Sequence, residues 1–220
     1  ATLSYHEQKD IENIKKLREL QKELPSFCSD FFRGIETSTS TRTRIAYAYD
    51  LKIFFQFLKT ANPGTFDNPS HTLTPSDLEK LTVTDLEEYI DYLKCHPSDT
   101  NEDVINTERG LMRKVSSLRS FYSYFFRNER IEKNPAALVR MPKLHEKEII
   151  RLEIDEVAKL LDEVEEGDKL TEKQKLYHER TKVRDLAMMS LLLGTGIRVS
   201  ECVGLNINDI DLDTCGARVY

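Results

Sequence analysis

The apolar positions of the chain recur mostly at helical spacing and predict a mainly α-helical protein. One face of a helix in the first half is formed by five apolar residues: Tyr47, Leu51, Phe54, Phe55 and Leu58. This helix should end before Asn62-Pro63-Gly64, where a loop rich in proline, asparagine and threonine begins and runs to about residue 74. We expect two earlier helices, at residues 5–24 and at about 27–35, and a polar segment at 37–41 that caps the next helix.

Polar residues at cap spacing mark two further helix starts. The segment Thr74-Pro75-Ser76-Asp77 predicts a short helical turn, because proline suits the first helical position. The segment Thr84-Asp85-Leu86-Glu87 has the spacing of a capping box and predicts a helix that His96-Pro97 ends.

The helix predicted over residues 106–128 has one apolar and one basic face. The apolar stripe consists of Leu111, Val115, Leu118, Tyr122 and Phe125. At about 100° per residue, the opposite side carries Arg109, Arg113, Ser116, Ser120 and Arg127, with Lys114 and Arg119 at its flanks. Arginines alternating with small hydroxyl side chains suit a helix that lies along a phosphate backbone. A merely solvated face is the alternative, and the near absence of acidic residues on this face favours the nucleic-acid interpretation.

Breaks in the apolar pattern predict a division into domains. Asn134-Pro135 and Met141-Pro142 enclose a segment that should not continue the helix. We therefore expect an N-terminal helix at 1–24, a helical domain at 25–140, a linker at 141–150 and a second domain at 151–220. The second domain should contain an amphipathic helix at 154–164, a charged insertion at 165–175, a buried apolar helix at 183–193 and a strand opening at 217–220.

Composition excludes several classes of protein and points to one kind of partner. The 220 residues are 39% apolar and 32% charged, as in globular proteins, and contain neither a run of about 18 apolar residues nor a signal-peptide pattern. We therefore expect a cytoplasmic protein without a membrane partner. The net charge is −6, yet residues 109–143 contain nine basic and only two acidic residues. Such a locally basic segment indicates a nucleic-acid contact.

The cysteines and histidines do not predict a metal site. Four cysteines are scattered without a C-x-x-C pair, and no histidine stands at ligand spacing from them: Cys28, Cys95, Cys202 and Cys215. We interpret them as reduced thiols of a cytosolic protein.

The segment from Gly194 to Glu201 carries the clearest candidate chemistry. Two glycines precede Arg198, and Glu201 follows it by about one helical turn. An arginine fork can hold two phosphate oxygens and stays protonated, and a carboxylate one turn later can orient the guanidinium or a neighbouring amide. The alternative is an ordinary helix corner with Arg198 in a surface ion pair.

The longer segment resembles the first catalytic box of the tyrosine recombinases, the phage-integrase and Xer family. The resemblance runs from Arg184-Asp185-Leu186-Ala187 through Gly194–Glu201 to Leu205 and Asp209-Ile210-Asp211. Upstream, residues 47–58, Leu118-Arg119-Ser120-Phe121-Tyr122 and Asn134-Pro135-Ala136 are similar to the family's core-binding domain. The resemblance implies a helical, SAM-like core-binding bundle followed by the first, helical part of an α+β catalytic domain.

This resemblance also implies an activity, partners and site residues. Such enzymes bind duplex DNA, assemble with other recombinase subunits into a tetramer on it, and break and rejoin strands through a 3′-phosphotyrosine, without a metal or nucleotide cofactor. Arg198 would be the first catalytic arginine and Glu201 its supporting residue. The expected DNA-binding residues are Arg42, Thr43, Arg44, Arg109, Arg113, Lys114, Ser116, Arg119, Ser120 and Lys143.

The family's remaining catalytic residues have no matching positions here, and Tyr220 does not match the family's nucleophilic tyrosine. We therefore expect a C-terminally truncated recombinase that binds duplex DNA but does not cleave it alone. A non-catalytic DNA-binding regulator and a helical protein-interaction module remain alternatives. Chromosome-dimer resolution and integration of a mobile element are not separable from the sequence.

Overall fold

Apolar stripes closed by polar caps account for most of the secondary structure. The computed structural model describes residues 5–97, 102–145, 148 and 150–219, and most of these are helical. The prediction of a mainly α protein is therefore confirmed. The chain divides into unit 1, residues 1–146, and unit 2, residues 147–220, which we describe separately. The finer domain limits of the sequence analysis stay a prediction.

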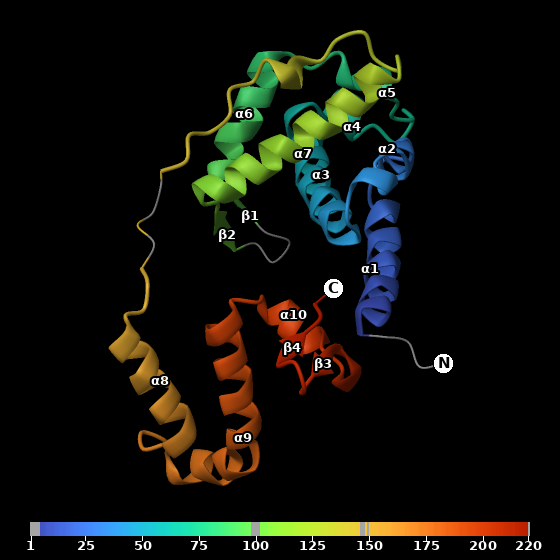
Figure 1. Cartoon of the computed structure of the whole chain (residues 1–220). Helices are drawn as coiled ribbons and strands as arrows, with labels where there is room; N and C mark the ends of the chain where they lie inside the picture. Colours follow the sequence, from blue (N-terminus) through green and yellow to red (C-terminus); the bar gives the residue numbers. More distant parts are fainter. Residues whose placement is uncertain (1–4, 98–101, 146–147, 149, 220) are drawn as a thin grey trace. The chain divides into compact units, whose positions relative to one another are not determined.

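Unit 1 contains helices and one small hairpin (Figure 1). Its elements are α1 (Tyr5–Lys22), α2 (Cys28–Gly34), the 3₁₀ turn η1 (Glu36–Ser38), α3 (Thr41–Ala61), α4 (Pro63–Phe66), α5 (Pro75–Leu78), α6 (Val83–Lys94), β1 (Cys95–Pro97), β2 (Asp103–Ile105), α7 (Glu108–Arg127) and the 3₁₀ turn η2 (Pro135–Ala137). Strands β1 and β2 pair antiparallel, with Cys95 opposite Ile105. The turn α4 lies in the stretch expected to be a loop, and Pro63 occupies its first position.

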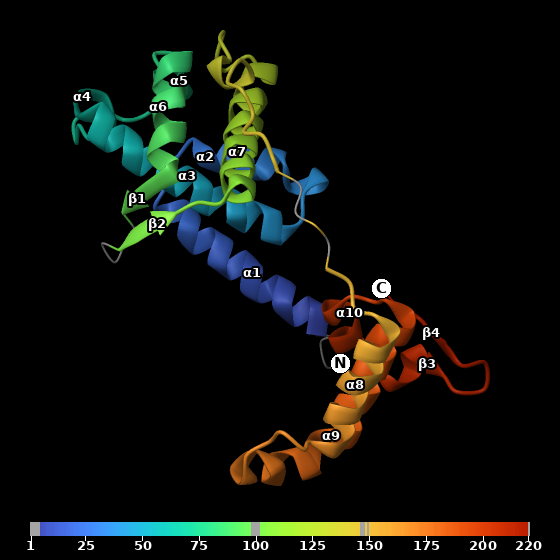
Figure 2. The same ribbon diagram turned by 90° about the vertical axis from the view of Figure 1, so that its left-hand side faces the viewer.

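The core of unit 1 lies where α2, α3 and α7 meet. Helix α7 packs against α2, α3 and α6, and α1 packs along α3 (Figure 2). The ring of Phe121 on α7 lies 5.2 Å from Phe31, 5.1 Å from Phe125 and 6.2 Å from Phe55, measured between centroids. All four rings are buried, each typically stabilising the fold by about 1.5–3 kcal/mol. Both predicted apolar stripes, on α3 and on α7, contribute to this core.

The N-cap of helix α6 lies two residues earlier in the chain than the sequence predicted. Thr82, not Thr84, is the N-cap: its hydroxyl accepts from the Asp85 amide at 3.3 Å, and Asp85 accepts from the Thr82 amide at 2.7 Å. The motif Thr82-x-x-Asp85 is also a reciprocal cap. The prediction that the helix starts at the cap Thr84-x-x-Glu87 was therefore wrong by two residues.

The segment after α7 folds back onto unit 1. Helix α7 ends at Arg127, as the sequence predicted to within a residue, and Asn134 caps η2 by accepting from the Ala137 amide at 3.2 Å. Ala136 and Val139 are buried. Residues 135–139 are thus part of the bundle.

Unit 2 contains α8 (Ile154–Glu166), α9 (Glu172–Thr195), α10 (Val199–Gly204), the 3₁₀ turn η3 (Ile207–Asp209) and strands β3 (Ile210–Asp211) and β4 (Gly216–Ala217). Helices α8 and α9 lie side by side (Figures 1 and 2). The turn between them begins at Gly167, whose φ of 70° favours glycine. A Cβ there would lie 2.9 Å from the His178 ring, which in turn lies 2.8 Å from the Val164 carbonyl oxygen.

Three expectations for unit 2 were wrong. Helix α9 begins at Glu172, inside the predicted charged insertion. The apolar stretch 183–193 is not buried, since Val183 is 78% exposed and no described residue of α9 is fully buried. The last strand is β4, which pairs antiparallel with β3, and of the expected residues only Ala217 belongs to it. Tyr220 lies outside the described residues.

No helix among the described residues is both long and apolar enough to span a membrane.

Candidate nucleic-acid interface and phosphate-binding box

The turn between α9 and α10 sets the position of Arg198. Gly196 caps α9 with φ of 69°, a conformation that glycine adopts without strain, and its amide donates to the Leu192 carbonyl at 2.9 Å. Gly194 lies within α9 and has open space where a Cβ would be. Of the two glycines that precede Arg198, only Gly196 therefore requires glycine. The chain then places Arg198 at the N-cap of α10.

Glu201 binds Arg198 twice. One carboxylate oxygen accepts from the Arg198 backbone amide at 2.7 Å, and the other accepts from Nη1 of its guanidinium at 2.8 Å. Both hydrogen bonds lower the pKa of Glu201 below its ordinary value, and the one from the backbone amide has the larger effect. Glu201 thus stays ionised and fixes both the cap of α10 and the direction of the arginine.

Arg198 is held and yet accessible. Its side chain is 82% exposed, and among the described residues only Glu201 binds its guanidinium. Nε and Nη2 remain available as donors. An arginine held at its base with free donors can bind a phosphate oxygen with little loss of side-chain entropy.

The basic face of α7 is more engaged than its sequence suggested. Nη1 of Arg113 donates to the Asp50 carboxylate at 2.6 Å and to the Ala46 carbonyl at 3.4 Å, both on α3. Lys114 is buried, and its Nζ donates to the Asn106 side chain at 2.7 Å. The expectation that acidic partners are nearly absent from this face was therefore wrong for Arg113, because the partner comes from another helix.

Asp50 is the acidic partner that the sequence analysis missed. It is 2% exposed, and burial raises its pKa to about 6, although Arg113 and Lys114 act in the opposite direction. Burial likewise lowers the pKa of Lys114. No spacing rule connects residues 50 and 113, so only the packing of α3 on α7 reveals this pair.

Two further arginines of the predicted DNA-binding set make internal contacts. Arg119 donates from Nε to the Ala136 carbonyl at 3.1 Å, and its Nη2 donates to the carbonyls of Ala137 and Val139. It therefore holds η2 against α7. Arg44 is buried, and its Nη1 donates to Glu36 at 2.7 Å.

The remaining predicted residues lie closer to solvent. Arg42, Arg109 and Lys143 are exposed, and none of them has an ion pair among the described residues. Thr43 is half-buried, and its amide donates to the N-cap Ser40 at 3.2 Å. Ser116 and Ser120 are half-buried on α7, and the Ser116 hydroxyl donates to the Met112 carbonyl at 2.8 Å. The side chains most available for a phosphate backbone in unit 1 are therefore Arg42, Arg109 and Lys143.

Both units of the chain are similar in sequence to known proteins. The profile of the phage integrase family matches residues 150–220. The tyrosine recombinase XerC of Caldanaerobacter subterraneus subsp. tengcongensis is 35% identical over 198 residues, which are 86% of this chain and 50% of that protein. The tyrosine recombinase XerS of Streptococcus uberis is 31% identical over 224 residues, which are 90% of this chain and 61% of that protein. The tyrosine recombinase XerC of Chlorobaculum tepidum is 30% identical over 209 residues, which are 93% of this chain and 55% of that protein.

The chain thus spans about half the length of the curated relatives that it matches. The search of solved structures found no significant match.

Proposed function

The chain belongs to the phage integrase family of tyrosine recombinases, and from this premise we propose that it is part of a site-specific DNA recombinase. Unit 1 binds duplex DNA, and unit 2 supplies the first catalytic arginine. The observation that carries this proposal is Arg198, which Glu201 holds at the start of α10 while its guanidinium remains 82% exposed. The protein acts in the cytoplasm, together with other recombinase subunits on the DNA.

Arg198 acts on the phosphate that is cut. When a tyrosine hydroxyl attacks the phosphorus, negative charge develops on the non-bridging oxygens, and a fixed cation stabilises that charge most in the transition state. The arginine donates to these oxygens, and its direction is set by the Glu201 carboxylate, whose pKa the contacts with Arg198 lower further below neutral pH. As the tyrosine oxygen bonds to the phosphorus, the bond from the phosphorus to the 5′ oxygen breaks, and that oxygen leaves as a 5′-hydroxyl that takes up the proton lost by the tyrosine. Rejoining reverses the step: a 5′-hydroxyl attacks the phosphorus and releases the tyrosine, without a metal or nucleotide cofactor.

Unit 1 contributes DNA binding through its exposed basic side chains. Arg42 lies at the start of α3 and Arg109 at the start of α7, both exposed and without an ion pair among the described residues. Such side chains contact phosphates without reading the sequence, and each contact releases counterions from the DNA. Arg113, Lys114 and Arg119 support the bundle instead, and contribute to DNA binding mainly by holding α3, α7 and η2 in place.

Duplex binding is tested by fluorescence anisotropy over a series of salt concentrations. The double variant Arg42→Gln with Arg109→Gln removes two exposed cations, so the slope of log K against log salt should become shallower by about 2. Arg180→Gln, on an exposed position of α9, removes one positive charge from unit 2 and serves as the control. If the double variant and the control bind with the same slope as the parent chain, the assignment of these residues to DNA is wrong.

The catalytic assignment is tested in the whole recombinase with a nicked suicide substrate that traps the covalent protein–DNA adduct. Arg198→Gln should reduce the rate of adduct formation by roughly 100-fold or more, since one transition-state donor is lost, while DNA affinity changes little. An Arg198→Gln enzyme that forms the adduct at the parent rate would refute the role of this arginine.

A further inference from the structure

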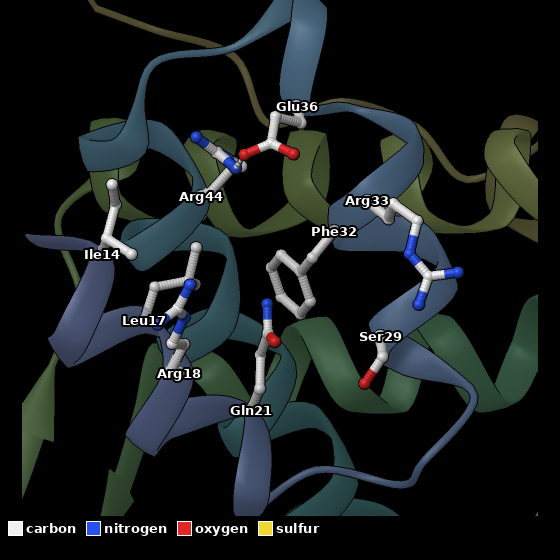
Figure 3. Close-up of a pocket in the computed structure, with 9 residues that line it drawn as sticks. All are labelled: Ile14, Leu17, Arg18, Gln21, Ser29, Phe32, Arg33, Glu36 and Arg44. Atoms are coloured by element: carbon white, nitrogen blue, oxygen red, sulfur yellow. Dashed lines mark hydrogen bonds and ion pairs between the residues drawn. The ribbon is translucent and has the colours of Figure 1, made fainter.

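A hollow of about 300 Å³ lies on unit 1 where α1, α2 and the start of α3 meet. Figure 3 shows side chains of α1 on one wall, those of α2 on the other, and Arg44 with Glu36 at the top. Three arginines line it, together with an amide and a hydroxyl that can also donate: Arg18, Arg33, Arg44, Gln21 and Ser29. Phe32 lies between the two walls.

Arg44 is the most constrained cation of this hollow. Its side chain is 10% exposed, and among the described residues its buried Nε has no hydrogen-bond partner. Nη1 donates to Glu36 at 2.7 Å, and Nη2 lies 3.5 Å from the Thr41 hydroxyl. A buried guanidinium with an unpaired donor is costly unless an acceptor reaches it.

Positive charge exceeds negative charge around the hollow. Glu36 is the acidic residue that lines it, against three arginines. Arg18 has no ion pair among the described residues, and the nearest carboxylate oxygen to Arg33 is that of Asp30 at 3.8 Å. The Glu36 side chain is 61% exposed, so water competes with Arg44 for its carboxylate. The ion pair with Arg44 therefore holds Glu36 only weakly.

We propose that this hollow binds a phosphate group, which contacts Arg44 and Arg18 in the place of the Glu36 carboxylate. Glu36 acts as an internal anion that an incoming phosphate displaces, and Arg44 then gains a stronger acceptor. A volume of about 300 Å³ leaves room for an organic group attached to the phosphate. The phosphate belongs either to the backbone of DNA or to a free phosphate ester, and only the DNA source rests on the proposed function.

Binding is tested on the full chain with inorganic phosphate and pyrophosphate at constant ionic strength, by NMR of the arginine Nε–Hε signals. The Arg44 signal, assigned with Arg44→Lys, should shift and saturate. Glu36→Gln should tighten phosphate binding about fivefold, because the competing carboxylate is gone, and Arg18→Gln should weaken it about fivefold. Arg180→Gln is the matched control and should leave the affinity unchanged.

The sign of the Glu36→Gln effect separates a specific site from general attraction to a positive surface. Both Glu36 and Arg18 are exposed, so at least one of the two variants should fold, as far-UV circular dichroism will show. The proposal is overturned if the Arg44 signal does not saturate, if Glu36→Gln leaves binding unchanged or weaker, or if Arg180→Gln weakens binding as much as Arg18→Gln.

A second titration identifies the source of the phosphate. If Glu36→Gln also tightens binding of a duplex oligonucleotide and pyrophosphate competes with that duplex, the hollow receives a DNA backbone phosphate. If phosphate binds but neither variant changes duplex affinity, the hollow receives a free phosphate ester. If the chain binds no DNA at all, the proposed function fails, and the phosphate titration still decides whether this site exists.

Discussion

The ion pair between Asp50 and Arg113 gives a quantitative prediction about unit 1. Asp50 is 2% exposed, and its pKa is raised from 3.8 to about 6, chiefly by burial. A shift of this size corresponds to roughly 3 kcal/mol between the two protonation states. Replacing Arg113 by glutamine removes the closest cation, so the buried carboxylate at neutral pH becomes less stable still.

The effect on stability follows from the direction of the pKa shift. The folded state binds the Asp50 proton more tightly than the unfolded state does. The stabilisation from that proton is therefore complete below pH 4 and lost as the pH rises through about 6. In Arg113→Gln the pKa of Asp50 moves higher, so the variant should lose about 2–3 kcal/mol at pH 7 and much less at pH 5. Arg113 is 45% exposed, and we therefore place the loss below the 3–5 kcal/mol typical of a broken buried pair.

The assay is urea denaturation of the full chain at pH 5 and pH 7, followed by far-UV circular dichroism. Arg109→Gln, one turn earlier on α7 and exposed, is the matched control and should change the free energy of unfolding by less than about 0.5 kcal/mol. In an Asp50→Asn background, Arg113→Gln should cost little at either pH, because no buried charge remains.

Two results would refute this reasoning. One is an Arg113→Gln variant that is as stable as Arg109→Gln at pH 7. The other is a loss of the same size at pH 5 and pH 7, since then a contact other than the charge of Asp50 would be responsible.

Two more predictions concern the elements around this pair. Thr82→Ala should destabilise unit 1 by about 1 kcal/mol in urea denaturation, because α6 loses its N-cap, whereas Thr84→Ala should be nearly neutral. If Thr84→Ala were the more destabilising variant, Thr84 would be the N-cap, as the sequence predicted. Arg119→Ala should cost about 1–3 kcal/mol and speed amide hydrogen exchange at Leu138 and Val139, because three carbonyls lose their donor; unchanged exchange there would show that Arg119 does not hold η2.

Helices were predictable from the sequence where apolar spacing and a cap agreed. The stripes that include Leu51 and Leu118 identified α3 and α7 and the faces they bury. Local signals were weaker where two caps compete within three residues, as at Thr82 and Thr84, or where a short turn such as α4 has too few residues for a periodic pattern.

The candidate box was also visible in the sequence, because its parts lie close together in the chain. Arg198 and Glu201 are one turn apart, so a local cap brings them together without help from other elements. The role of Gly196 follows from its positive φ, whereas Gly194 lies within the helix, a difference that the letters alone do not reveal.

The sequence by itself thus determined the helical class, the family resemblance and the local pairing of Arg198 with Glu201, because each depends on residues a few positions apart. Tertiary structure decided which cations are free. Arg113 meets Asp50 across α3 and α7, Arg119 meets the carbonyls of residues 136–139, and Arg44 meets Glu36 beside α1 and α2. A helical wheel shows which way a side chain leaves its own helix but not which oxygen another element places in front of it.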